Sequence, residues 1–67
     1  MIAVLINGTS KEIKIGTTIS QLVSQLNITD KKIALEANGE IIPRSQFGFR
    51  ILEDGDQIEI VTAVGGG

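Results

Sequence analysis

Residues 2–26, which read IAVLINGTSKEIKIGTTISQLVSQL, decide the fold. Residues 2–6 are a short apolar run rich in β-branched side chains, and Asn7-Gly8 follows directly. Asn-Gly strongly favours a two-residue hairpin turn, because both turn positions need a positive φ. Residues 12–15 then alternate polar and apolar, as a half-buried strand does. We therefore predict that residues 2–6 and 12–15 pair as a β-hairpin.

The second part of this stretch predicts one amphipathic helix. Thr18 suits the N-cap position, and Gln21 three residues later completes a capping box. Apolar residues then recur at helical spacing and form one stripe, made of Ile19, Leu22, Val23 and Leu26. Asn27 is a typical residue for the end of a helix. The spacing predicts a helix of about two turns or slightly more.

The rest of the chain completes an α+β pattern. The same signals predict strands at residues 33–37, 40–42 and 57–64, the turn Asn38-Gly39, and a short helical turn at 44–47. A single helix cannot cover both faces of a sheet, so the sheet must wrap around one side of it. We predict a β-grasp fold, a mixed four- to five-stranded sheet around one main helix, with the first and last strands parallel. The domain is expected to span residues 1–64, with a flexible glycine tail at 65–67.

Length and composition exclude several classes of function. The 67 residues contain no Cys and no His, which removes thiol nucleophiles, Ser-His triads and the usual zinc, copper or haem ligands. The net charge of -2 argues against nucleic-acid binding. The two aromatic residues, Phe47 and Phe49, are expected in the core or at a sheet edge and not as a platform on which bases stack. No apolar run approaches the roughly 20 residues of a membrane span. We expect a cytoplasmic protein that is not an enzyme and has neither catalytic residues nor a metal site.

The alternation along the strands predicts an apolar outer face of the sheet. Glu59 marks one side of the last strand as the solvent side. The outward positions of the central strands then carry apolar residues, namely Ala3, Leu5, Ala34, Val61 and Ala63. Contiguous exposed apolar surface often marks a partner site, whereas scattered exposed aliphatic residues are normal. On the residues alone both interpretations stay open. The candidates for a partner-binding surface are Leu5, Val61 and Ala63.

The sequence ends in Gly65-Gly66-Gly67. Glycine has no Cβ, so such a segment adopts many backbone conformations and can pass through a narrow channel. A free carboxylate is ionised at neutral pH and is a poor electrophile, so it must be activated before it reacts, for example as a mixed anhydride with AMP. The sequence contains neither GxxxxGK[ST] nor GxGxxG, so a second protein that binds ATP would perform the activation. A frayed tail without function is the alternative.

Residues along essentially the whole chain resemble the ThiS family, the sulfur carriers of thiamine (thiazole) biosynthesis within the ubiquitin-like β-grasp superfamily. The residues that carry the resemblance are the opening strand with Asn7-Gly8, the helix start at 17–22, and residues 34–44, 52–58 and 66–67. The most specific stretch is 38–44, NGEIIPR, which separates this group from the small subunit of molybdopterin synthase and from ubiquitin. Gly65 is a minor departure that adds a third glycine.

The resemblance implies a mechanism centred on Gly67. An E1-like adenylyltransferase of the ThiF type would use ATP and Mg²⁺ to adenylate the Gly67 carboxylate. A sulfur donor such as a persulfide-bearing protein would then leave a thiocarboxylate there, and thiazole synthase of the ThiG type would accept the sulfur. Gly65 and Gly66 would thread the partners' active sites, and the face with Leu5 and Val61 would dock on the adenylating enzyme. The chain itself would bind no cofactor.

Two other functions remain open at this point. One is a sulfur carrier for molybdopterin or another pathway, which shares the fold and the terminal glycines. The other is a β-grasp protein-interaction module with an inert tail. Deletion of Gly66 and Gly67 separates a carrier from an interaction module, because only the carrier needs them.

Overall fold

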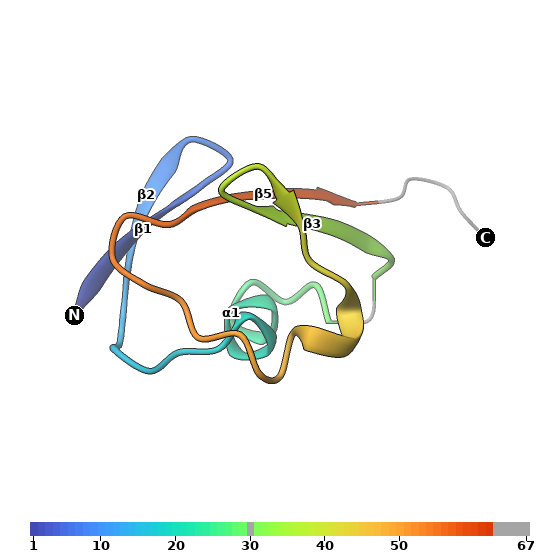
Figure 1. The fold of residues 1–67 in the computed structure, drawn as a ribbon, viewed down its shortest axis with the longest axis horizontal. Coiled ribbons are helices and arrows are strands. Elements are labelled where there is room, and N and C mark those ends of the chain that lie inside the picture. Colours follow the sequence, from blue (N-terminus) through green and yellow to red (C-terminus); the bar gives the residue numbers. More distant parts are fainter. Residues whose placement is uncertain (30, 63–67) are drawn as a thin grey trace.

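The computed structural model describes residues 1–29 and 31–62, and shows a five-stranded sheet with one main helix on one side (Figure 1). Its elements are β1 (Ile2–Ile6), β2 (Thr9–Ile13), α1 (Ile19–Gln25), β3 (Ile33–Ala37), β4 (Glu40–Ile41), the 3₁₀ turn η1 (Arg44–Gln46) and β5 (Gln57–Thr62). The strands lie in the order β2-β1-β5-β3-β4. β1 and β5 are parallel and all other pairs are antiparallel. The predicted β-grasp layout is therefore confirmed.

The two Asn-Gly turns determine how the hairpin strands pair. Asn7 and Gly8 have φ of 49° and 85°, and Asn38 and Gly39 have φ of 54° and 84°, as type I′ turns require. The first turn aligns Ile6 with Thr9, so β2 begins immediately after the turn. The predicted strand at 12–15 is wrong in its bounds. Since β1 begins at Ile2, opposite Ile13, Ile15 has no strand residue to pair with and is 78% exposed.

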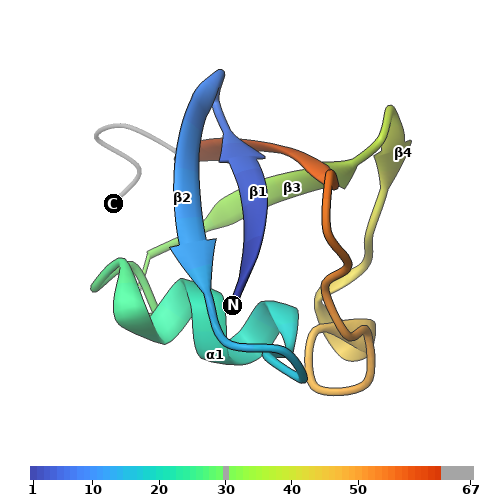
Figure 2. The ribbon, with the colours of Figure 1, turned by 90° about the vertical axis from the view of Figure 1, so that its left-hand side faces the viewer.

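The helix begins and ends where its capping residues predict. The Gln21 N–H donates to Thr18 Oγ1 at 3.2 Å, and the Thr18 N–H donates to Gln21 Oε1 at 2.9 Å, so the capping box is complete. Asn27 adopts the left-handed conformation with φ of 60° directly after the C-cap Leu26. Figure 2 shows α1 lying beneath the curved sheet.

The hydrophobic core lies between α1 and the inner face of the sheet. Its most buried side chains are Ile19 and Leu22 from the helix and Val4, Leu35 and Ile58 from the strands. Ile13 and Ala37 are also buried, and four further inward strand residues, Ile2, Ile6, Ile33 and Ile60, are partly buried and pack against this cluster. The predicted inward and outward alternation is therefore confirmed in β1, β3 and the described part of β5.

The two phenylalanines differ in their surroundings. Phe47 is buried in the core, as predicted. Phe49 is 83% exposed, so the expectation that it lies in the core or at a sheet edge is wrong. The Phe49 and Arg50 N–H groups both donate to the Gln46 carbonyl, and this tight loop leaves the Phe49 side chain in solvent.

The described residues end at Thr62, within the predicted last strand. Residues 63–64 of that strand and the predicted tail at 65–67 lie outside the described residues, so the domain boundary stays a prediction. In residues 1–29 and 31–62, no helix is long and apolar enough to cross a membrane. Over the same residues, no group of three or more His, Cys, Asp or Glu is placed to hold a metal ion.

Candidate functional site

β5 leads to the glycine segment and lies between β1 and β3 in the sheet (Figure 1). Its parallel register with β1 aligns Leu5 with Gln57 and Ile6 with Ile58. Its antiparallel register with β3 runs from the Ala37–Ile58 pair to the Ile33–Thr62 pair. A strand paired on both sides opens only with much of the fold, so β5 is a rigid base for the residues that follow it.

The Asn7 side chain extends the pairing between β1 and β5. The Ile60 N–H donates to Asn7 Oδ1 at 2.7 Å, and Asn7 Nδ2 donates to the Ile60 carbonyl at 3.1 Å. The Asn7 backbone N–H also donates to the Ile58 carbonyl at 2.9 Å. The amide thus imitates one more peptide group of β1, and β5 stays bound on this side beyond the last paired residue.

Asn38, in the turn between β3 and β4, binds the start of β5. Its backbone N–H donates to the Gln57 carbonyl at 2.8 Å, and the Gln57 N–H donates to Asn38 Oδ1 at 2.9 Å. Asn38 Nδ2 donates to Asp56 Oδ1 at 2.9 Å, and the Glu53 N–H donates to Asp56 Oδ2 at 2.8 Å. The Asp56 side chain is only 6% exposed, so it joins the turn to the strand within the protein interior.

Sequence reasoning predicted both turns but missed what their asparagine side chains do. Their partners in β5 are 53 and 19 residues away, beyond the reach of any local pattern. One signal was present in the sequence. Glycine also suits the first position of a type I′ turn, so asparagine at that position in both turns adds an amide that can donate and accept like a peptide group.

The outer face of the sheet, the side away from α1, carries both predicted docking residues. Leu5 is 37% exposed and Val61 is 67% exposed, so their outward orientation is confirmed. Leu5 lies beside Gln57, four residues before Val61, so the two are about 13 Å apart along the sheet. Glu59 lies between them and is paired with Glu36 of β3. This acidic pair separates Leu5 from Val61 on the outer face, and the docking role of both residues stays a prediction.

Val61 is the outer-face residue nearest to Thr62, where the described part of β5 ends. Val61 is paired with Ala34 of β3, and both are exposed. The third predicted docking residue, Ala63, lies outside the described residues, as do Gly65, Gly66 and Gly67, so their roles stay predictions.

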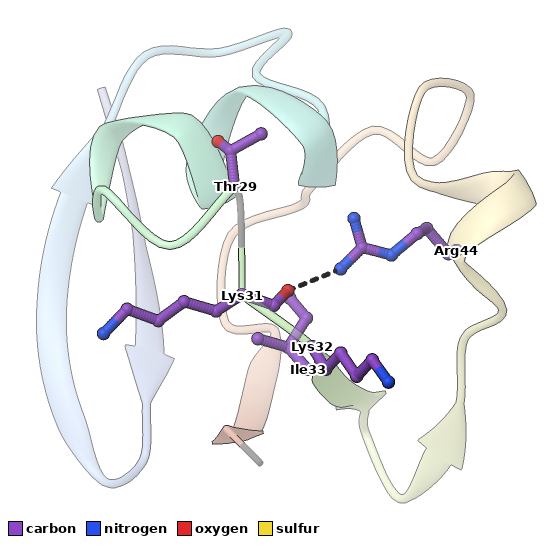
Figure 3. Close-up of a pocket in the computed structure, with 5 residues that line it drawn as sticks. All are labelled: Thr29, Lys31, Lys32, Ile33 and Arg44. Atoms are coloured by element: carbon purple, nitrogen blue, oxygen red, sulfur yellow. Dashed lines mark hydrogen bonds between the residues drawn. The ribbon is translucent and has the colours of Figure 1, made fainter. Parts of the chain in front are cut away.

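An open depression at the same end of the sheet is strongly basic. We call it the basic depression, and its lining consists of Thr29, Lys31, Lys32, Ile33 and Arg44 (Figure 3). Arg44 Nη2 donates to the Lys31 carbonyl at 2.9 Å, and the guanidinium carbon lies 5.7 Å from the centroid of the Phe47 ring. The sequence pattern gave no reason to place these residues together.

The sequence profile of the ThiS family matches residues 4–67. The chain belongs to the ThiS family. It is 34% identical over 64 residues to the sulfur carrier protein ThiS of Escherichia coli, which covers 96% of this chain and 97% of that protein. The crystal structure of a thiamine biosynthesis protein (ThiS) from Geobacter metallireducens matches with a TM-score of 0.83 and 26% identity, over 98% of this chain and 100% of that one. The resemblance inferred from the sequence is thus confirmed.

A longer protein also contains a region similar to this ThiS-family chain. A thiazole synthase from Paramagnetospirillum magneticum is 36% identical over 63 residues, which is 94% of this chain. The chain spans only 19% of that protein's length.

Proposed function

We propose that the chain is a sulfur carrier for thiazole formation in thiamine biosynthesis, and that it carries the sulfur on the carboxylate of Gly67. The observation that carries this proposal is the match to the ThiS family over residues 4–67, which includes the terminal glycines. The name of the Escherichia coli relative, a sulfur carrier, supports it. The composition agrees, because a chain without cysteine has no thiol on which to hold transferable sulfur.

The chemistry needs an activating partner. On an E1-like adenylyltransferase of the ThiF type, the Gly67 carboxylate attacks the α-phosphorus of Mg²⁺-bound ATP, which forms an acyl adenylate and releases pyrophosphate. The terminal sulfur of a persulfide donor then displaces AMP. Cleavage of the donor's S–S bond by a thiol reductant leaves the thiocarboxylate on Gly67. In this scheme the chain is a substrate of enzymes and not a catalyst.

The pairing of β5 with β1 and β3 supports such a role, because a carrier must present its reactive end at a constant place. Five residues follow Thr62, and a fully extended segment of that length reaches at most about 17 Å. The reactive centre of each partner must therefore lie within this distance of the end of β5. This reach makes the surface around Val61 the part of the outer face that partners contact.

The region of similarity within a longer thiazole synthase favours thiazole formation over molybdopterin synthesis. A thiazole synthase that contains a region similar to this chain suggests that a carrier of this kind and a thiazole synthase act in the same reaction. We therefore propose thiazole synthase, of the ThiG type, as the acceptor of the carried sulfur.

The proposed function is tested by pyrophosphate release. The chain is mixed with a ThiF-type adenylyltransferase, ATP and Mg²⁺, and the pyrophosphate formed is measured against a reaction without the chain. We expect release that depends on both proteins and an AMP adduct on the chain in the absence of a sulfur donor. Release that does not depend on the chain contradicts the proposal.

A charge placed at Val61 tests the docking surface. We expect Val61→Glu to raise the KM for the chain in pyrophosphate release by about tenfold or more, because a carboxylate would be buried against the partner without a counter-charge. The control is Ile15→Glu, which introduces the same charge at an aliphatic residue that is also largely exposed but lies outside the strands of the sheet. Leu5→Glu should have the smaller effect, because Leu5 lies beside Gln57, at the other end of β5 from Thr62. An unchanged KM for Val61→Glu means that Val61 belongs to ordinary surface.

A further inference from the structure

We propose that the basic depression is a docking site for an acidic rim around the channel by which the adenylating partner takes up the glycine segment. This inference rests on the proposed function, because it requires a partner that encloses the tail. It adds a second contact, electrostatic in character, to the apolar contact proposed around Val61.

The position of the basic depression follows from the sheet register. Ile33, which lines the depression, is paired with Thr62, the last described residue of β5. Lys31 and Lys32 directly precede Ile33, so they lie beside the point where the chain continues toward the glycines. A partner whose active centre lies within about 17 Å of Thr62 must face this end of the sheet.

The basic depression is continuous with the outer face. A neighbouring depression is lined by Lys32, Ile33, Ala34 and Val61. Lys32 and Ile33 belong to both depressions, so the surface passes from the exposed apolar pair Ala34 and Val61 to the cationic side chains without interruption. A partner seated on Val61 would therefore also meet Lys32.

The charge of the basic depression indicates an acidic partner. Three of the six basic residues of the chain, Lys31, Lys32 and Arg44, line it, although the chain carries a net charge of -2. No carboxylate is among the described lining residues; Asp30, next to Lys31, is not described. Complementary charge around an entry site raises the rate of encounter and orients the two proteins before the tail enters.

The side chains suit an extended acidic surface better than one small anion. Figure 3 shows that the side chains of Lys31 and Lys32 point in different directions, with Arg44 reaching in from η1. Arg44 is held by its hydrogen bond to the Lys31 carbonyl and by the Phe47 ring, and this bond uses only one of the five donors of a guanidinium. The depression thus offers one cation held in place beside two lysine side chains that point in different directions.

Charge reversal of the two lysines tests the proposal. We expect the double variant Lys31→Glu, Lys32→Glu to raise the KM for the chain in pyrophosphate release about tenfold or more, with kcat within about twofold of wild type. The matched control is Lys11→Glu, Lys14→Glu, which makes the same change in net charge on and just after the edge strand β2 and should leave the KM within about twofold. Wild-type KM should also rise with salt concentration more steeply than that of the Lys31, Lys32 variant.

Other outcomes of this experiment contradict the docking site. Equal increases in KM for the two double variants show an effect of net charge alone. A raised KM for ATP with an unchanged KM for the chain shows that the lysines serve a phosphate. Circular dichroism verifies folding, and Lys31→Gln, Lys32→Gln should show an increase in KM smaller than that of the reversal. If wild type supports no pyrophosphate release at all, the proposed function fails, and the docking site fails with it.

Discussion

Deletion of Gly66 and Gly67 is expected to reduce sulfur transfer to background while the domain stays folded. Without Gly67 the proposed carboxylate is missing, and the shortened tail no longer reaches the active centre of the adenylating enzyme. Every residue of the described core lies at or before Ile60, so we expect the melting temperature to change by less than about 3 °C. Thiocarboxylate formation and thermal unfolding of the same samples measure the two effects.

The control for this deletion is a chain with one alanine added after Gly67. It keeps all three glycines but moves the terminal carboxylate to a residue with a side chain, and we expect it to be nearly as inactive as the deletion variant. If the deletion variant instead keeps its full activity, the chain is an interaction module whose tail is inert, and the carrier mechanism is wrong.

The second large effect concerns stability. We expect Asp56→Ala to lower the free energy of unfolding by about 2–4 kcal/mol, because it leaves Asn38 Nδ2 and the Glu53 N–H without their acceptor in a buried site. In a domain of this size such a loss lowers the melting temperature by about 10 °C or more. Urea unfolding followed by circular dichroism gives the free energy directly.

Asp54→Ala is the matched control, because it removes a carboxylate from the same turn. Asp54 is exposed and accepts one hydrogen bond, from the Ala3 N–H at 2.9 Å, so its loss should cost about 1 kcal/mol or less. Equal costs at the two positions would contradict the interpretation that Asp56 joins the Asn38 turn to the start of β5.

The order of elements could be predicted because its signals are local. Asn-Gly pairs predict turns, the capping box from Thr18 predicts the helix start, and alternation predicts which strand residues face the core. The error in β2 has a physical cause in the first turn. A two-residue turn aligns Ile6 with Thr9, and this register overrides the alternation that pointed to residues 12–15.

The contacts that hold β5 and form the basic depression could not be predicted in the same way. Asn7 binds a strand residue 53 positions away, and Arg44 binds a carbonyl 13 positions away, so both contacts exist only after the sheet has formed. The alternation of side chains along the last strand placed Val61 on the outer face. It did not reveal that Glu36 and Glu59 divide that face, because their pairing depends on the register of β3 with β5. The role of Gly67 stays a prediction that rests on composition and resemblance.

The most direct test of the carrier mechanism is the mass of the chain after incubation with a ThiF-type adenylyltransferase, ATP, Mg²⁺, a persulfide donor and a thiol reductant. The mechanism predicts a gain equal to one oxygen replaced by sulfur. It also predicts that a thiol-selective alkylating agent traps the product and that peptide mapping locates the alkyl group at Gly67. Oxidation of Met1 gives nearly the same gain in mass, so the mapping decides. A change located only at Met1, with no alkylated Gly67, contradicts the mechanism.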